Sequence, residues 1–465
     1  MNALVRETID IWHIIKGRPV CRGEVSFNSG NLAFRTPKLD LGELTWTRLE
    51  PCPAAHLPSS EIIDLLAETG KAVAANTGGF IGEAIDQLAA TSAYARPVLE
   101  RMFADMHPYF DPDHLRTMVE FELGGFDVLD SWRTVGRGDA TARVHAYPPR
   151  TVHVLAGNAP IVATMTIARV ALTKGVGLLK LASNDLFTVP AVLRTMAHIA
   201  PDHPVVRSFS AVYWRGGDER VESALFRAQF FDKLVAWGGD AAIRGSIKYL
   251  TPGFELISFD PKNSITMIGK EAGDSPENMA VAAVGAAEKI TMFNQEACAS
   301  TRFVYAEGTT AQVDKFCEAL LPELGKARPE IYADARSEPV PQDLQEEISV
   351  LKQLAPEYRV WGEYDGRGMV VRSDEPVDFY PTNRVVNVVR VDDLSDALRW
   401  VNVSTQSVSI YPKARISGLV DGLANGGAQA ISPLGEPEEK GPIAGAPHDG
   451  IYPLPRMMRW VERRD

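Results

Sequence analysis

The chain has 465 residues and a mass of 50.8 kDa, which is enough for about two or three domains with their own cores. Hydrophobic residues make up 45% and charged residues 23%, a composition that excludes disordered, collagenous and fibrous chains. The formal net charge of −12 leaves no general basic surface, so we expect no nucleic-acid partner.

The cysteines argue against disulfides and structural metals. They are scattered along the chain and contain no C-x-x-C pair, so we expect reduced thiols and no metal site. They are Cys21, Cys52, Cys298 and Cys317.

The apolar segments predict neither a signal peptide nor a membrane span. Residues 1–12 contain acids and no apolar run of signal-peptide length. The longest apolar region, 151–182, is interrupted by Arg169, Lys174 and Lys180. We therefore expect a cytoplasmic protein.

The first part of the chain changes from strand-like to helical patterns at Ser59. Residues 1–58 contain short alternating runs typical of strands. Ser59 begins a helix whose apolar residues recur at helical spacing, and further helices are expected near 81–103 and 113–123. Residues 1–125 are therefore predicted to form a largely helical front end.

Strands and helices then alternate through the middle of the chain. Apolar, β-branched runs predict buried strands, and the stretches between them have helical spacing. The expected strands are 140–149, 151–156, 175–181, 210–214 and 233–237, and the expected helices are 161–172, 190–200 and 221–230. This alternation predicts a parallel sheet with helices on both faces.

The same alternation resumes after Lys262 and predicts a second α/β domain, from about 263 to 440. Its expected helices are 278–290, 310–321 and one that begins at Leu394, and its expected strands are 301–305 and 385–391. The stretch 432–455 is rich in Pro and Gly and is expected to be a long loop, of a length that is often functional.

The segment 293–300, FNQEACAS, contains the most informative cysteine. Cys298 is expected just after a helix, between small residues that leave room for a substrate carbonyl at the sulfur. The neighbouring Glu296 does not favour a thiolate, so activation must come from the fold. A lone cysteine is more often buried and inert than nucleophilic, and the local sequence alone leaves both readings open.

The segment resembles the active-site motif F-N-x-G-x-x-C of the aldehyde dehydrogenase superfamily, with Glu296 in place of the glycine. Within that superfamily the chain is most similar to the LuxC-type acyl-CoA reductase family, over about residues 60–465. The motifs that carry the resemblance stand in order as 154–160 (VLAGNAP), Lys180, Gly238-Gly239, 262–264 (KNS), Asn294-Gln295 with Cys298, and 445–450 (GAPHDG).

The resemblance implies two doubly wound α/β domains, a helical N-terminal part and a small oligomerisation segment. Residues 1–262 would form the helical part and the NADP(H)-binding domain, with an oligomerisation hairpin near 131–149. Residues 263–440 would form the catalytic domain that carries Cys298. Residues 441–465 would be a C-terminal loop and tail, with a contact to another copy in a homo-oligomer.

For the reaction, the resemblance implies attack of the Cys298 thiolate on an acyl thioester, followed by reduction of the acyl-enzyme to an aldehyde with NADPH. Asn158, at the end of a buried strand, would form an oxyanion hole with the Cys298 backbone N–H. The alternative for Asn158 is a residue that only completes a strand-to-helix turn.

The cofactor residues follow from the same resemblance. Gly175-Val176-Gly177 lacks the third glycine of a dinucleotide fingerprint and is read as a close-packed strand start. Lys180 matches the lysine that contacts the adenosine ribose, unless it is a surface lysine. Ser183 stands where relatives that prefer NAD carry Glu, which favours NADP(H). Gly238 and Gly239 would let the backbone approach the pyrophosphate, unless they form a plain turn.

Two acidic positions of the superfamily have no clear counterpart. Ser258 stands where hydrolytic aldehyde dehydrogenases carry the glutamate that activates water, although Asp260 is near enough to substitute. The glutamate that holds the nicotinamide ribose has no clear counterpart around 380–384. The first departure favours thioester reduction over oxidation of an aldehyde to an acid.

His448, next to Asp449-Gly450, has two interpretations. It could donate a proton or line the acyl entrance, or it could be a structural residue beside an Asp-Gly turn, which we favour. The acyl donor could be CoA, a carrier protein or an acyl-activating synthetase partner. The competing functions are an oxidising aldehyde dehydrogenase and an acyl-accepting subunit without redox activity.

Overall fold

The chain folds into two compact units. The computed structural model describes residues 8–30, 32–436 and 443–464. The first unit consists of residues 1–92, 102–260 and 440–465, and the second of residues 93–101 and 261–439. The expected boundary at 440/441 lies outside the described residues.

The first unit contains a seven-stranded sheet in the order β12-β11-β8-β9-β10-β2-β3, whose first five strands are parallel. Its strands are β12 (Glu255–Phe259), β11 (Lys233–Trp237), β8 (Arg150–Val154), β9 (Val176–Lys180), β10 (Phe209–Val212), β2 (His13–Ile15) and β3 (Arg18–Val20). All residues of β9 are buried, as expected for a strand covered by helices on both faces.

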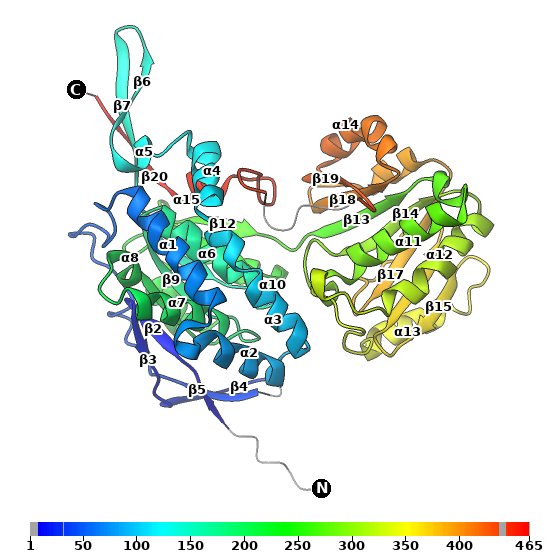
Figure 1. The fold of residues 1–465 in the computed structure, drawn as a ribbon, viewed down its shortest axis with the longest axis horizontal. Coiled ribbons are helices and arrows are strands. Elements are labelled where there is room, and N and C mark those ends of the chain that lie inside the picture. The colour runs from blue at the N-terminus through cyan, green and yellow to red at the C-terminus, as the bar shows by residue number, and fades with distance from the viewer. Residues whose placement is uncertain (1–7, 31, 437–442, 465) are drawn as a thin grey trace. The chain divides into compact units, whose positions relative to one another are not determined.

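Helices cover this sheet. Those of the first unit are α1 (Ser59–Ala74), α2 (Phe80–Thr91), α4 (Pro112–Leu123), α5 (Asp127–Asp130), α6 (Ile161–Leu172), α7 (Thr188–Ile199), α8 (Pro204–Arg207), α9 (Glu219–Leu225), α10 (Asp240–Ile247) and α15 (Pro453–Met457), and α3 spans Arg96–Ala104. Helices α1, α6 and α7 pack together, whereas α10 packs against β11 and β12 (Figure 1).

Two small sheets complete the first unit. One has the order β1-β5-β4, from β1 (Ile9–Asp10), β5 (Leu32–Thr36) and β4 (Val25–Ser29). The other has the order β20-β7-β6, in which β6 (Arg133–Arg137) and β7 (Ala140–Tyr147) form a projecting hairpin and β20 (Arg459–Arg463) pairs antiparallel with β7 (Figure 1). The C-terminal tail is therefore a strand of the hairpin's sheet.

The second unit contains another seven-stranded sheet, in the order β15-β16-β17-β14-β13-β18-β19. Only β15 is antiparallel to its neighbour. The strands are β15 (Arg359–Glu363), β16 (Gly368–Ser373), β17 (Val385–Val391), β14 (Thr301–Glu307), β13 (Asn263–Ile268), β18 (Thr405–Tyr411) and β19 (Ala430–Pro433).

Successive residues of these strands enter two cores, one on each face of the sheet. Val304 and Ala306 of β14 pack with the helices α11 (Pro276–Thr291) and α12 (Thr310–Leu324). Tyr305 packs on the other face with η6, a 3-10 helix (Leu394–Trp400), and α14 (Ile416–Gly426). A further helix, α13 (Gln342–Leu351), covers β16 near β15.

Several sequence expectations were wrong in detail. The helix expected over 81–103 is two helices, α2 and α3, because Ser92 and the residues up to Ala95 leave helical geometry ahead of Pro97. The helix expected over 221–230 ends at Leu225. The helix expected from Leu394 is the short 3-10 helix η6.

The reading of Gly175-Val176-Gly177 as a close-packed strand start is confirmed. A Cβ atom on Gly175 would lie 2.4 Å from the Pro149 carbonyl oxygen. A Cβ on Gly177 would lie 3.0 Å from Val170 of α6. These glycines therefore let the loop and the helix approach the sheet closely.

Candidate functional site

The first unit gathers most of the sequence-predicted residues at one edge of its sheet. Asn158 follows β8, Lys180 ends β9, and Gly238 follows β11. Because β8 pairs in parallel with both β9 and β11, the carboxyl ends of the three strands lie side by side. This edge is where open α/β sheets bind ligands.

Lys180 is buried, with 7% of its surface exposed, so the surface-lysine reading is wrong. Its Nζ lies 5.8 Å from the ring centroid of Tyr213 and 5.7 Å from that of Trp214. Burial lowers the pKa of Lys180, and the attraction of Glu222 opposes this effect. The structure thus keeps the Lys180 amine against aromatic faces at the sheet edge.

The loops after β8 and β9 touch each other. A Cβ on Gly157 would lie 2.2 Å from the Asn184 Oδ1, so only glycine lets these loops come this close. Ser183 is exposed in the turn that follows β9. Asp185 then accepts hydrogen bonds from the backbone of Phe187 (3.2 Å) and Thr188 (3.0 Å), which fixes the start of α7.

Gly238 and Gly239 connect β11 to the N-terminus of α10. Gly238 has a φ of 145°, a value that side chains disfavour. No atom lies within 4 Å of a Cβ placed on Gly239, so the space in front of the helix is open. A helix N-terminus with open space and no side chain suits the approach of a phosphate group.

His448 packs against aromatic rings at the same edge. Its ring centroid lies 5.4 Å from Trp237 and 5.2 Å from Phe259, which end β11 and β12. Those two rings stack on each other at 3.8 Å. Burial lowers the pKa of His448 to about 3, and the charge of Arg169 adds to the effect. The imidazole is therefore neutral at physiological pH.

The residues after His448 form the expected Asp-Gly turn. Asp449 and Gly450 have φ values of 52° and 75°. The backbone N–H of His448 donates to the Ile451 carbonyl at 2.8 Å, and that of Ile451 donates back at 3.1 Å. The structural reading of the motif thus agrees with the geometry.

The candidate nucleophile belongs to the second unit. Cys298 is exposed. It lies between η4, a 3-10 segment (Met292–Gln295), and β14. The helix expected before the cysteine is α11, which ends at Thr291, and the chain bends through η4 before it reaches Cys298. Phe293, Asn294 and Gln295 have φ values of 51°, 52° and 68°, in the left-handed region that non-glycine residues disfavour.

Buried hydrogen bonds hold this bend in place. The Gln295 Nε2 donates to the carbonyls of Thr301 (3.1 Å) and Val385 (3.0 Å), and its Oε1 accepts from the backbone N–H of Arg384 (2.7 Å). The Asn294 Oδ1 accepts from Asp334 N–H (2.9 Å) and from the Arg384 guanidinium (2.7 Å). The Asn-Gln pair of the motif is therefore the support of the cysteine loop.

The motif at 262–264 also contacts this loop. The Ser264 hydroxyl donates to the Cys298 carbonyl at 2.9 Å, and the Ser407 hydroxyl donates to Ser264 at 2.8 Å. The backbone of Cys298 is thus fixed from the neighbouring strands β13 and β18.

The sequence reasoning missed three residues at this loop. Arg302, Asp334 and Arg384 lie far apart in the sequence and carry no motif, so only the fold identifies them. Arg302 and Tyr380 are near enough to Cys298 to interact with its charge.

The two positions where a base could activate water for hydrolysis, Ser258 and Asp260, lie on β12 and directly after it. Ser258 pairs with Ala236 of β11 and is half-buried. Asp260 follows the strand and is exposed. Neither Ser258 nor any residue of β12 after Glu255 provides a carboxylate.

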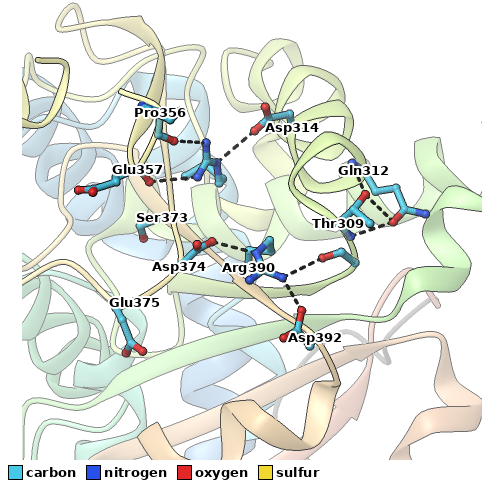
Figure 2. Close-up of polar contacts among 12 residues, drawn as sticks. Thr309, Gln312, Asp314, Pro356, Glu357, Ser373, Asp374, Glu375, Arg390 and Asp392 are labelled. Atoms are coloured by element: carbon cyan, nitrogen blue, oxygen red, sulfur yellow. Dashed lines mark hydrogen bonds and ion pairs between the residues drawn. The ribbon is translucent and has the colours of Figure 1, made fainter. Parts of the chain in front are cut away.

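The opposite edge of the second unit's sheet carries charges that neutralise one another. Figure 2 shows Arg390 between Asp374 (2.9 Å) and Asp392 (2.6 Å). Arg372 pairs with Asp314 at 3.2 Å. These paired charges stabilise the strand ends, and the loop with Cys298 lies at the amino end of β14.

The described residues contain neither a metal-binding cluster nor a membrane-spanning helix. No cluster of three or more His, Cys, Asp or Glu side chains is arranged to hold a metal ion. Nor does any helix in that part of the chain have the length and apolar character needed to cross a membrane.

Comparison with known proteins identifies relatives over most of the chain. Residues 54–460 match the sequence model of the family described as Acyl-CoA reductase (LuxC). The long-chain acyl-protein thioester reductase of Photorhabdus laumondii is 32% identical over 354 residues, covering 75% of this chain and 70% of that protein. The enzyme of the same name from Aliivibrio fischeri is 31% identical over 359 residues, with the same coverage of both chains.

Solved structures establish the fold. An NADP-dependent glyceraldehyde-3-phosphate dehydrogenase from Bacillus halodurans superposes with a TM-score of 0.72 at 14% identity, covering 98% of this chain and 99% of that one. An NAD-dependent benzaldehyde dehydrogenase from Corynebacterium glutamicum gives a TM-score of 0.71 at 14% identity, covering 98% and 97%. The expected aldehyde-dehydrogenase-like α/β fold is confirmed.

The buried His448 gives a pH prediction for stability. An unfolded histidine has a pKa of about 6.5, whereas burial lowers that of folded His448 to about 3. The unfolded chain therefore binds the proton first, and stability is lost as pH falls below about 6.5. Between pH 7 and pH 5 the free energy of unfolding should fall in the wild type. We expect it to fall by about 1–2 kcal/mol less in the His448→Phe variant, which has no imidazole to protonate.

Urea denaturation at pH 7 and pH 5 measures this difference. His56 is exposed, so the His56→Phe variant is a matched control that should keep the wild-type pH dependence. An identical loss in the wild type and His448→Phe would contradict burial of a neutral imidazole.

Proposed function

The chain belongs to the acyl-CoA reductase (LuxC) family, and from this we propose that it reduces a fatty acyl thioester to the aldehyde with NADPH, through an acyl group carried on Cys298. The observation that carries the proposal is the exposed Cys298 on a rigid, left-handed bend. A thiol that is exposed while its backbone is fixed suits attack on a carbonyl carbon.

The first step is acyl transfer to sulfur. The Cys298 thiolate attacks the thioester carbonyl, the tetrahedral intermediate collapses, and the carrier leaves as a thiol after it takes up a proton. One thioester replaces another, so the free energy changes little. The acyl-enzyme keeps a carbonyl that is more reactive toward hydride than an ester or amide.

The second step reduces this carbonyl. The acyl-enzyme carbonyl would accept a hydride, which NADPH would supply when bound. The resulting thiohemiacetal oxyanion would then collapse to the aldehyde and the Cys298 thiolate. Lys180, Ser183, Gly238 and Gly239 would hold the nucleotide. The fit rests on the buried Lys180 amine and on the open space in front of α10.

Both steps place negative charge on the substrate oxygen. We assign its stabilisation to the side-chain amide of Asn158 and the backbone N–H of Cys298. Ser258 brings no carboxylate to activate water, so the acyl-enzyme should persist long enough for reduction. This favours reduction over the oxidising aldehyde dehydrogenase reaction.

The acyl donor and the assembly are part of the proposal. The relatives' name, long-chain acyl-protein thioester reductase, favours an acyl group delivered on a protein, such as an acyl-activating synthetase, over free acyl-CoA. The projecting sheet β20-β7-β6 exposes Val135, Tyr147 and Trp460, and we assign it the contact between copies in a homo-oligomer.

The central prediction concerns Cys298. With NADPH and a long-chain acyl thioester as donor, supplied on CoA or on a carrier protein, the protein should oxidise NADPH. The Cys298→Ala variant should lose this activity because no acyl-enzyme forms. Absorbance of reduced nicotinamide measures the rate, and Cys21→Ala is the matched control with unchanged rate. Aldehyde-dependent formation of NADPH and acid would instead identify an oxidising dehydrogenase, and acylation without redox turnover would identify an acyl-accepting subunit.

The oxyanion role of Asn158 predicts a selective loss. Removing one such donor in Asn158→Ala should lower turnover by about 100-fold or more, with the thermal transition preserved. Exposed Asn28, on β4, provides the control variant Asn28→Ala with normal turnover. Turnover unchanged in Asn158→Ala would remove this residue from the mechanism.

Ser183 predicts the cofactor preference. Ser183→Glu introduces a carboxylate that repels a 2′-phosphate, so kcat/KM with NADPH should fall by about tenfold relative to NADH. Steady-state kinetics with both cofactors provide the comparison. A wild type that strongly prefers NADH would reverse the assignment of Ser183.

A further inference from the structure

A buried arginine lies next to the cysteine loop. Arg302 is the second residue of β14, and only 5% of its surface is exposed. Burial lowers the pKa of Arg302, which shows that keeping the guanidinium here costs free energy. A buried cation needs compensating contacts, and those of Arg302 lead to the loop that carries Cys298.

Two hydrogen bonds join the two segments that surround the thiol. The Arg302 Nη2 donates to the Gln295 carbonyl at 2.6 Å, on the left-handed bend. Its Nη1 donates to the Pro381 carbonyl at 2.7 Å, on the loop before β17. One rigid, planar group therefore sets the distance between these backbone segments.

The remaining contacts of the Arg302 guanidinium are with Tyr380, whose side chain also hydrogen-bonds to it. The guanidinium carbon lies 4.4 Å from the ring centroid of Tyr380. The Arg302 Nε is buried, and within the described chain it has no hydrogen-bond partner. The anionic or ionisable groups whose charges act on Arg302 are Tyr380, Glu296 and Cys298.

We propose that Arg302 is the positioning residue of the Cys298 thiol. It clamps the left-handed bend to the 380–384 loop and keeps its positive charge within reach of the sulfur, so that the thiolate is favoured. Burial raises the pKa of Glu296, and the charge of Arg302 opposes this effect. The ionised Glu296 carboxylate opposes the effect of Arg302 on the sulfur, because it repels a thiolate two residues away. Tyr380 shields the guanidinium from water, which preserves its attraction for the sulfur.

The positive charge of Arg302 would favour the thiolate form of Cys298, which the proposed reaction needs. A cysteine with an ordinary pKa is mostly protonated at neutral pH, and the thiolate is the attacking species. Acyl transfer removes the negative charge from sulfur, and the later release of the aldehyde restores it. A fixed cation beside the sulfur favours that release, because the thiolate leaves toward a positive charge. This inference rests on the proposed function for its catalytic meaning, whereas its test does not.

The test measures ionisation of the thiol directly. Iodoacetamide alkylates the thiolate, so the rate of Cys298 modification against pH, followed on its peptide by mass spectrometry, gives a midpoint. Arg302→Met should move this midpoint upward by about one pH unit or more. Glu296→Gln should move it downward. An unchanged midpoint in Arg302→Met would overturn the proposal.

Arg384 supplies the matched control. It is a buried arginine that also holds the bend, through Asn294 and Asp334, and the charges that act on it are those of Asp334 and Arg328. Arg384→Lys should lower the thermal stability and leave the midpoint where it is. An equal upward shift in Arg384→Lys would show that Arg302 acts only through the fold, and would also overturn the proposal.

A further variant keeps the test decisive if Arg302→Met does not fold. Tyr380→Leu leaves Arg302 in place and lets water reach it, so the midpoint of Cys298 alkylation should rise by less than in Arg302→Met. No rise in Tyr380→Leu would contradict the charge argument. Alkylation needs neither NADPH nor a thioester. A protein without reductase activity but with an Arg302-dependent midpoint would therefore contradict the proposed function alone.

Discussion

The bend that precedes Cys298 is the constraint on which the proposed chemistry of the second unit depends. Three consecutive non-glycine residues adopt left-handed backbone conformations, each of which costs about 1–3 kcal/mol. They persist because buried Gln295 and Arg384 satisfy the polar backbone groups around them. The result is an exposed thiol on a loop whose unusual backbone is held by buried hydrogen bonds.

The first unit brings its candidate site residues together through ordinary parallel-sheet geometry. Three neighbouring strands end at one edge, and each strand end places a different feature there: an amide after β8, a buried amine at the end of β9 and an open helix N-terminus after β11. His448 comes to this edge from the C-terminal segment and packs as a neutral ring. The carboxyl edge therefore combines binding features that lie far apart in the sequence.

Much of this arrangement could be predicted from the sequence. Apolar runs identified β8, β9 and β11 because strands buried on both faces are continuously hydrophobic. The order of the motifs then identified Asn158, Lys180 and Cys298 as candidate site residues. The sequence could not show that Asn294 and Gln295 support the loop, because their partners Asp334 and Arg384 come from distant segments. Periodicity also failed at 81–103, where the apolar spacing continues across the break between two helices.

The most direct measurement is a mass spectrum of the protein after incubation with a panel of acyl thioesters in the absence of NADPH. We expect the mass to increase by one acyl chain, on the peptide that contains Cys298. The extent of acylation across thioesters of different length reports the preferred chain length. Acylation at another residue, or reductase activity in a protein that never becomes acylated, would contradict the covalent route.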